Sequence, residues 1–176
     1  MNSAHVLILH GSPGSGKSTL LRPIAEQLGA AGIPCGVIDA DELNLAFPAP
    51  EPDFWLSNLA AIWQNYVRVP NIHVVISTVV ADAERLERLR DAVPAASFSV
   101  CELTAPSDVL LARVNDREPT EALRESLRAW VDHHAARTDL ESIRDVLVST
   151  HDRSEDDAAR EVLRAVGWMP GGQGRE

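Results

Sequence analysis

Short apolar runs alternate along the chain with longer stretches in which apolar residues recur every three or four positions. Strands that are buried on both faces are continuously apolar, whereas amphipathic helices repeat every 3.6 residues. The runs predicted to be strands are 5–10, 35–39, 72–80, 97–103 and 145–150. The stretches predicted to be helices are 17–31, 53–68, 82–92, 105–115, 121–137 and 154–166. This alternation indicates β–α–β units and a parallel sheet.

Five strands joined by crossover helices predict an α/β fold, a three-layer α/β/α sandwich around a five-stranded parallel sheet. The crossovers should be right-handed, and a ligand site is expected at the C-terminal ends of the strands. No repeat or long linker interrupts residues 1–168, which we therefore predict to form a single domain. The glycine-rich residues 169–176 are expected to be a flexible tail.

Capping residues and tryptophans add detail to the predicted helices. Asp53 and Thr104 precede two of them, where a side-chain oxygen can accept a hydrogen bond from the first turn. Ser154 with Asp157 is a variant of the capping box that opens the last helix. Helical spacing among apolar neighbours predicts core positions for Trp55, Trp63 and Trp130.

Charge and hydropathy restrict the classes of partner. The 176 residues carry a net charge of −10, which argues against long nucleic acids because these bind basic surfaces. No apolar run approaches the ~20 residues that span a bilayer, and no signal peptide opens the chain. We therefore expect no membrane partner and a cytoplasmic protein. Cys35 and Cys101 lie in strand-like contexts, which favours buried free thiols.

One lysine stands among fifteen arginines, and it lies in a G-x-x-x-x-G-K-[ST] motif. The residues predicted to surround the phosphates are Gly11, Ser12, Pro13, Gly14, Ser15, Gly16, Lys17, Ser18 and Thr19. Glycines allow positive φ and close approach, and the successive N–H groups and the next helix favour anions. The motif predicts ATP with Mg²⁺: Lys17 on the β- and γ-phosphates, Ser18 on the metal and Thr19 near the α-phosphate. An ammonium suits that position better than the planar fork of arginine.

Residues 7–19, together with the Asp-Ala-Asp sequence at 39–41, resemble the P-loop small-molecule kinases. This group includes shikimate, gluconate, adenylyl-sulfate and chloramphenicol kinases, which share the nucleoside-monophosphate-kinase fold. The resemblance implies that Asp39 helps to hold Mg²⁺ and that Asp41 binds the acceptor hydroxyl and takes its proton. Carboxylates suit both tasks, and side chains two apart share a face if the strand continues. Aspartate is also ordinary at the start of a helix, so a capping role stays open.

The third predicted strand carries no acidic residue at its end. Ser77 and Thr78 stand where motor and switch ATPases have the Walker-B aspartate. This departure favours a small kinase in which Asp39 supplies the carboxylate, and it disfavours a machine driven by hydrolysis.

Arg113 and Arg117 bracket Val114-Asn115-Asp116, and a polar break at 116–120 follows the fourth predicted helix. The resemblance implies a short lid at about 113–120, in which Arg113 or Arg117 closes over the phosphates and stabilises the transferring group. Alternatively, these two arginines are solvated charges near the C-terminus of a helix, where cations are favourable. Arg124 and Arg128 on the next helix are secondary candidates.

Other arginines follow the third and fifth strands. The resemblance implies that Arg153, in the segment where related kinases hold adenine, stacks on the base. Arg85 and Arg88 are one turn apart and resemble arginines that contact the anionic substrate of adenylyl-sulfate kinases. The density of charge over 84–90 favours a solvated face instead.

The leading hypothesis is an ATP-dependent kinase that phosphorylates a hydroxyl of a small metabolite or antibiotic. The alternative is a nucleotide-binding module that regulates a protein partner. The acceptor should bind within about 41–68, where Trp55 is a candidate lining residue, but these residues do not identify it. The sequence also leaves open the oligomeric state and the preference for ATP over GTP.

Overall fold

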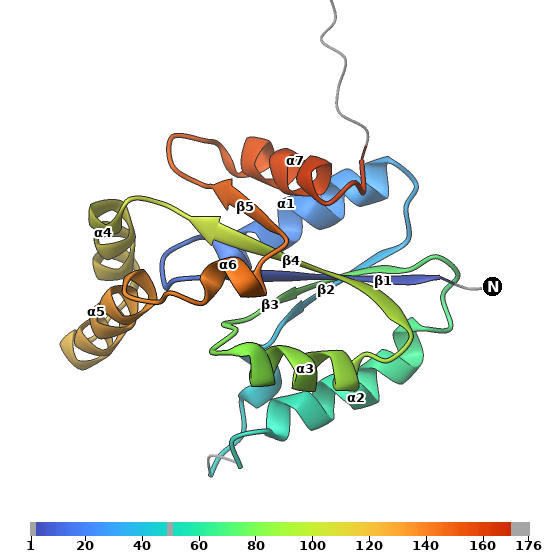
Figure 1. Cartoon of the computed structure of the whole chain (residues 1–176), viewed down its shortest axis with the longest axis horizontal. Coiled ribbons are helices and arrows are strands. Elements are labelled where there is room, and N and C mark those ends of the chain that lie inside the picture. Colours follow the sequence, from blue (N-terminus) through green and yellow to red (C-terminus); the bar gives the residue numbers. More distant parts are fainter. Residues whose placement is uncertain (1–2, 49–50, 170–176) are drawn as a thin grey trace, which may run out of the picture.

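The computed structural model describes residues 3–48 and 51–169 and contains the five predicted strands. They are β1 (Ala4–Gly11), β2 (Cys35–Asp39), β3 (His73–Ser77), β4 (Ala96–Thr104) and β5 (Val146–Ser149). All pair in parallel, in the order β2-β3-β1-β4-β5 (Figure 1). The predicted parallel sheet is therefore confirmed, with the phosphate-binding motif directly after its central strand.

Helices cover both faces of the sheet, which gives the predicted three layers. The helices of the described residues are α1 (Lys17–Ala30), α2 (Phe54–Tyr66), α3 (Ala83–Ala92), α4 (Ser107–Arg117), α5 (Glu121–Ala135), α6 (Leu140–Ile143) and α7 (Glu155–Ala165). Helices α1 and α7 pack together on one face, and α2 and α3 on the other (Figure 1). Helices α4 and α5 form a hairpin beside the C-terminal edge of the sheet.

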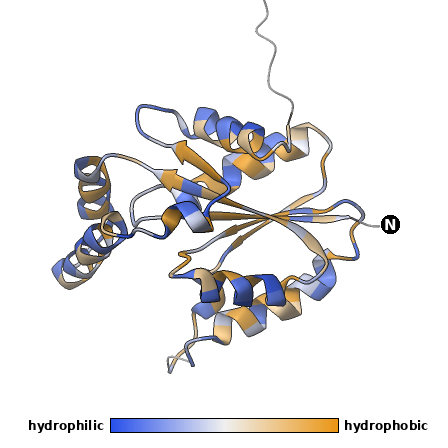
Figure 2. Ribbon diagram, viewed as in Figure 1, coloured by the Kyte–Doolittle hydropathy of each residue, from blue (hydrophilic) through white to orange (hydrophobic). Residues whose placement is uncertain are grey.

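Alternate residues of the central strand enter two separate cores. Val6 and Ile8 pack with the residues of α2 and α3, whereas Leu7 and Leu9 pack with those of α1 and α7. Figure 2 shows the strands as mostly apolar and the outer helices as richer in polar residues. The unbroken apolar runs thus reflect burial on both faces of a parallel sheet.

The α4–α5 hairpin has a small core of its own. It is centred on the buried Leu110, Val114 and Val131 and is separate from the two cores of the sandwich. A hairpin with its own core can keep its shape while its position relative to the sheet changes. The side chains that it carries toward the sheet are therefore held in a fixed relation to one another.

Several helix boundaries differ from those predicted. Helix α4 is capped at Pro106 rather than at Thr104, and it runs to Arg117, so the predicted polar break shrinks to 118–120. A 3₁₀ helix, η1 (Glu42–Asn44), and the short α6 were not predicted, because one turn of helix has no periodicity to detect. Ser154 does cap α7, with its hydroxyl accepting from the N–H of Asp157.

The core position predicted for Trp130 is wrong. Trp55 and Trp63 are buried as expected, but 45% of Trp130 is exposed. The buried face of α5 carries Val131 and His134 instead. Of the predicted tail, 170–176 lie outside the described residues, and no helix within the described ranges is long and apolar enough to cross a membrane.

Candidate active site

The loop between β1 and α1 passes through spaces that only glycine can occupy. Gly11, Gly14 and Gly16 have φ of 145°, 78° and 95°, as the motif predicts. A Cβ on Gly11 would lie 2.4 Å from the carbonyl oxygen of Leu103, and one on Gly14 would lie 2.7 Å from that of Leu110. The loop is thereby held against both β4 and α4.

The first turn of α1 is left open to an outside acceptor. Gly16 is the N-cap, and no side chain of the described residues caps the helix. Lys17 folds back over the loop, where its Nζ donates to the carbonyl oxygens of Gly11 and Ser12 at 2.9 and 3.1 Å. Free N–H groups and an ammonium thus converge on one hollow, an arrangement that suits phosphate oxygens.

Burial lowers the pKa of Lys17 from 10.5 to about 8. Asp41 and, more weakly, Asp39 oppose this shift, whereas Arg117 adds to it. Near pH 7 most molecules therefore still carry the ammonium charge. The charge is poorly solvated, so an anion in the hollow would stabilise it.

Two predicted loop residues turn their side chains away from the hollow. The hydroxyls of Ser12 and Ser15 are buried and have no hydrogen-bond partner among the described residues. Ser12 lines a back cavity of about 160 Å³ on the other side of the loop, together with Glu102 and His134. Ser12 can therefore reach a phosphate only through its backbone N–H, and the N–H of Ser15 already donates to the Ser12 carbonyl at 3.1 Å.

Three cavities adjoin along the C-terminal edge of the sheet, and we name each for a feature of its lining. The loop cavity, of about 130 Å³, is lined by Gly16, Lys17, Ser18, Asp41, Ser77 and Arg117. The α7 cavity, of about 330 Å³, is lined by Gly14, Thr19, Leu20, Arg117, Arg153 and Ala158. The Trp cavity, of about 280 Å³, is lined by Asp41, Asn44, Trp55, Thr78, Arg85 and Trp130.

The two aspartates do not share a strand face. Strand β2 ends at Asp39, and the chain then turns, with Asp41 in helical conformation at the start of η1. The carboxylate of Asp39 accepts the N–H of Asp41 at 3.1 Å. Asp41 lies on the border between the loop cavity and the Trp cavity.

Hydroxyls and carboxylates beside the loop cavity fit a magnesium ion that is bound mainly by a nucleotide. The Ser18 and Ser77 hydroxyls are 3.5 Å apart, and Asp39 is paired with Ser77 in the sheet register. The described residues hold no group of three or more His, Cys, Asp or Glu suited to a metal. Mg²⁺ commonly needs only one or two carboxylates when phosphates supply further ligands. Ser18 and Asp39 could hold it in this way.

Arg113 is fixed in place by groups on either side of the nucleotide loop. Its Nη1 donates to the carbonyl of Gly14 at 3.1 Å and to the Thr150 hydroxyl at 3.0 Å, and its Nη2 donates to the Thr150 carbonyl at 3.1 Å. The buried Thr150 hydroxyl in turn donates to the Ser15 carbonyl at 3.0 Å. Arg113 therefore ties α4 to the loop and to the end of β5. Thr150, at the end of a predicted strand, was not among the predicted site residues.

Arg117 is placed differently, although it lies only one turn further along α4. Its side chain is 62% exposed and pairs with Glu118 at 2.5 Å. It lines both the loop cavity and the α7 cavity. Of the two predicted lid arginines, Arg117 is thus the one with freedom to move at the border of two cavities.

Three more of the predicted arginines fall into two positions. Arg153 lines the α7 cavity with its side chain 40% exposed. Arg124 and Arg128 bind groups at the α4–α5 junction, with Arg124 donating to the Glu118 carbonyl and Arg128 to Asn115. These last two stabilise the hairpin and do not line the three cavities.

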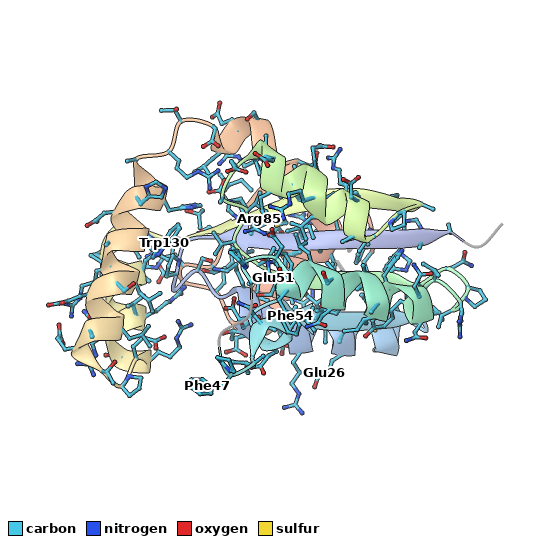
Figure 3. The ribbon with its side chains drawn as sticks, turned by 90° about the horizontal axis from the view of Figure 1, so that it is seen from below. Glu26, Phe47, Glu51, Phe54, Arg85 and Trp130 are labelled. Atoms are coloured by element: carbon cyan, nitrogen blue, oxygen red, sulfur yellow. The ribbon has the colours of Figure 1, made fainter. Side chains whose placement is uncertain are left out.

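The solvated face predicted for Arg85 is wrong. Its side chain is 24% exposed, donates to Asp53 at 3.0 Å and lines the Trp cavity. Arg88 pairs with the same carboxylate. Asp53 does occupy the N-cap of α2, but its side chain makes no capping hydrogen bond. Figure 3 shows Arg85 near the start of α3 and Trp130 on α5, across the opening between the hairpin and the sandwich.

Buried ionisable groups lie behind the loop. The Nδ1 of His10 accepts the N–H of Val80 at 2.9 Å, and burial lowers its pKa from 6.5 to about 3. Glu102 accepts hydrogen bonds from His134 at 3.2 Å and Arg144 at 2.5 Å. Burial alone would raise the pKa of Glu102, but these bonds hold it below its ordinary value. His10 thus has a structural role beneath the loop.

Comparison with known proteins identifies the kind of chain to which these features belong. A family profile described as an AAA domain matches residues 6–140, more than half of the chain. A search of curated proteins finds no match.

Several solved structures share the fold over nearly their whole length. Shikimate kinase from Acinetobacter baumannii, in complex with shikimate, is 17% identical, with a TM-score of 0.61 and 95% of each chain covered. APS kinase from Mycobacterium tuberculosis, in complex with AMPPNP and APS, is 21% identical, with a TM-score of 0.60 and coverages of 95% and 99%. The tunicamycin resistance protein of Deinococcus radiodurans is 18% identical, with a TM-score of 0.66 and coverages of 93% and 96%. This similarity shows that the chain has the fold of P-loop small-molecule kinases, of the nucleoside-monophosphate-kinase type.

Proposed function

The chain belongs to the AAA-domain family, and from that premise we propose that it is a kinase that uses ATP and Mg²⁺ to phosphorylate a hydroxyl of a small molecule. The single observation that carries the proposal is the serial arrangement of the three cavities. The α7 cavity and the loop cavity share Gly14, Gly16, Thr19 and Arg117. The loop cavity and the Trp cavity share Asp41, Thr78 and Val79.

Such a series suits transfer between two bound molecules better than hydrolysis alone. The α7 cavity would hold the nucleoside, the loop cavity the phosphates and the Trp cavity the acceptor. Alignment of two reactants in neighbouring sites supplies much of the catalysis of phosphoryl transfer. Solved proteins of this fold carry small acceptors: shikimate in one complex, and APS beside AMPPNP in another.

The proposed step exchanges one bond to phosphorus for another. The acceptor oxygen forms a bond to the γ-phosphorus while the bond from that phosphorus to the β,γ-bridging oxygen breaks. ADP leaves with the electron pair of the broken bond, and the hydroxyl proton passes to the Asp41 carboxylate. Asp41 suits this role because it borders both the phosphate and the acceptor spaces.

The reaction also requires positively charged groups around the phosphates. Lys17 sits in the hollow of the loop, and Arg117 can fold over it from α4. Bound Mg²⁺ neutralises charge that develops on the phosphates. Arg113 acts indirectly, since it positions the Gly14 carbonyl and the loop rather than the reacting group. Arg153 would contact the base.

The test is transfer of label from γ-³²P-labelled ATP to fractions of a metabolite and antibiotic library. The Lys17→Met variant serves as the blank, after a thermal melt has shown that it is folded. A labelled organic product that is absent from the blank would support the kinase. Release of free phosphate alone would favour a regulatory module that hydrolyses ATP, and bound ATP without any turnover would also count against the kinase.

A further inference from the structure

Two tryptophans from different helices line the Trp cavity. Trp55, on α2, is 7% exposed and is fixed in the core, whereas Trp130, on α5, is 45% exposed. The ring of His133, on the same helix, contacts Trp130 edge-on, with the centroids 5.5 Å apart. An indole that is exposed at a cavity wall can bury its apolar surface against a flat ligand, which favours binding.

Arg85 covers the ring of Trp55. Its guanidinium carbon lies over that ring, 5.5 Å from its centre. Its Nη1 donates to Asp53, and within residues 3–48 and 51–169 the other N–H groups of the guanidinium have no acceptor. A guanidinium held in this way presents donors in a fixed plane, which suits a carboxylate or another acceptor group on a ligand.

The polar groups of the cavity lie where it meets the phosphate space. Asp41 and Thr78 line both the Trp cavity and the loop cavity, whereas Trp55, Arg85 and Trp130 line the Trp cavity and not the loop cavity. Trp130 also borders a separate hollow with Ser126, Ala129 and His133. A ligand would therefore place a hydroxyl at Asp41 and Thr78 and a ring at Trp130. The volume of about 280 Å³ suits a small molecule rather than a polymer.

We propose that the Trp cavity binds a ring-bearing alcohol that also carries a hydrogen-bond-accepting group such as a carboxylate. The ring lies against Trp130, the acceptor group binds Arg85, and the hydroxyl to be phosphorylated faces Asp41. This assignment rests on the proposed kinase function and names its substrate class. It makes Trp130 and Arg85 specificity-determining residues.

The experiment compares matched sets of fragment-sized alcohols by ligand-observed NMR. One set has a ring and a carboxylate, the second has a ring alone, and the third consists of acyclic polyols and hydroxy acids. The full chain is first saturated with AMPPNP and Mg²⁺, so that binding at the loop does not compete. We expect ring-bearing acids to bind most often and most tightly, and each binder is then tested for phosphorylation by ATP.

Variants assign the two features to their residues. Trp130→Ala should weaken ring-bearing binders about 10-fold and leave acyclic ones unchanged, and Trp130→Phe should restore most of the affinity. Leu123→Ala is the matched control, because Leu123 is a comparably exposed apolar residue of α5 that does not line the cavity. Arg85→Gln should remove the preference for acids, whereas Arg90→Gln, on the same helix, should keep it.

The outcomes separate the substrate class from the kinase activity. Tightest binding by acyclic polyols, no ring-bearing binder at all, or a Trp130→Ala variant with unchanged preference would each overturn the proposed class. Phosphorylation of an acyclic binder would do so while leaving the kinase proposal intact. Ring-bearing acids that bind with the expected variant pattern but accept no phosphate would support the binding site and count against the kinase.

Discussion

The nucleotide side and the acceptor side of the candidate active site use different kinds of binding group. On the nucleotide side most binding groups are backbone N–H groups, joined by the Lys17 ammonium, and the side chains of Arg113 and Thr150 hold that backbone in place. On the acceptor side the binding groups are side chains of η1, α2, α3 and α5. The first site is thus defined by one short segment and the second by the packing of four elements.

Exposure of apolar groups shows the same difference. Leu45 and Phe47, which follow the cavity residue Asn44, are 76% and 100% exposed, and Trp130 is 45% exposed. On the nucleotide side Leu20 is almost fully buried. An apolar surface that stays open in a folded protein commonly marks a binding site. The acceptor side therefore depends on its ligand to complete it, whereas the nucleotide side is already formed.

Asp41 lies where the two sides meet, and its removal should have the largest effect. We expect Asp41→Asn to lower kcat by roughly 10²- to 10⁴-fold, because the amide cannot take the acceptor proton. Nucleotide affinity should persist, since the loop backbone and the Lys17 side chain stay in place, although loss of the Asp41 charge lowers the pKa of Lys17 further. Steady-state kinetics with the acceptor from the labelling screen, and calorimetry with AMPPNP, measure the two quantities.

Asp39→Asn is the matched control for that variant. If Asp39 serves the metal, its variant should need more Mg²⁺ for half-maximal rate and should recover at high Mg²⁺. Asp41→Asn should not recover. Full turnover of Asp41→Asn would contradict the proton-transfer role.

Variants of the two arginines of α4 should distinguish an effect on catalysis from an effect on stability. Arg117→Gln should lower kcat by roughly 10²- to 10³-fold. Its melting temperature should fall only slightly, because the amide of glutamine can still donate to the buried Glu118 carboxylate with which Arg117 pairs. Arg113→Gln should instead cost about 1–3 kcal/mol of unfolding free energy and raise the KM for ATP. Thermal melts and ATP titrations of both variants provide the comparison. The reverse pattern would exchange the two roles.

The same division explains what could be predicted from the sequence. The phosphate loop was predicted residue by residue because its function lies in local backbone geometry, which glycines at fixed spacing report. The strands were predicted because burial on both faces leaves an unbroken apolar run. The positive φ of Gly11, Gly14 and Gly16 and the parallel register of β1 follow from these two signals.

The acceptor side could not be predicted in this way. Helical periodicity indicates that Trp130 lies on an apolar face, but it cannot tell a core from a cavity wall. Arg85 stands in a run of charges, and only tertiary packing against Trp55 and Asp53 distinguishes it from its solvated neighbours. A shared face for Asp39 and Asp41 follows only if the strand continues, and nothing local marks the turn that comes after Asp39.

Acid should lower the free energy of unfolding, because a buried histidine lies behind the phosphate loop. His10 is neutral and buried, with its pKa lowered to about 3, so the unfolded chain binds a proton there that the folded chain does not. Stability therefore falls as the pH drops below the ordinary value of 6.5 and continues to fall toward 3. Between pH 7 and pH 5 this group alone should cost about 2 kcal/mol of unfolding free energy. Urea titrations across this range measure the slope.

His10→Asn keeps an acceptor for the N–H of Val80 but removes the titrating group. Its unfolding free energy should fall less steeply between pH 7 and pH 5 than that of the parent protein. His133→Asn, which removes an exposed imidazole of α5, is the control and should keep the parent slope. Equal slopes in all three proteins would refute the assignment to His10.

The smallest effect concerns the charge of Lys17 itself. Because its pKa is lowered to about 8, roughly half of the nucleotide-free molecules lack the ammonium proton at that pH. Phosphates in the hollow favour the charged form, so binding of AMPPNP near pH 8 should take up about half a proton per molecule. Calorimetry in buffers with different ionisation enthalpies measures this uptake.

Lys17→Arg tests the origin of that uptake, because arginine keeps its charge at this pH. The variant should take up no proton at any pH at which it binds AMPPNP. In the parent protein the uptake should shrink as the pH falls from 8 toward 7, where most Lys17 side chains are already charged. An uptake that is absent near pH 8, or that persists in Lys17→Arg, would mean that burial in the loop does not set the charge of this lysine. In that case Lys17 would not be held in its buried position, with hydrogen bonds to the Gly11 and Ser12 carbonyls, before ATP binds.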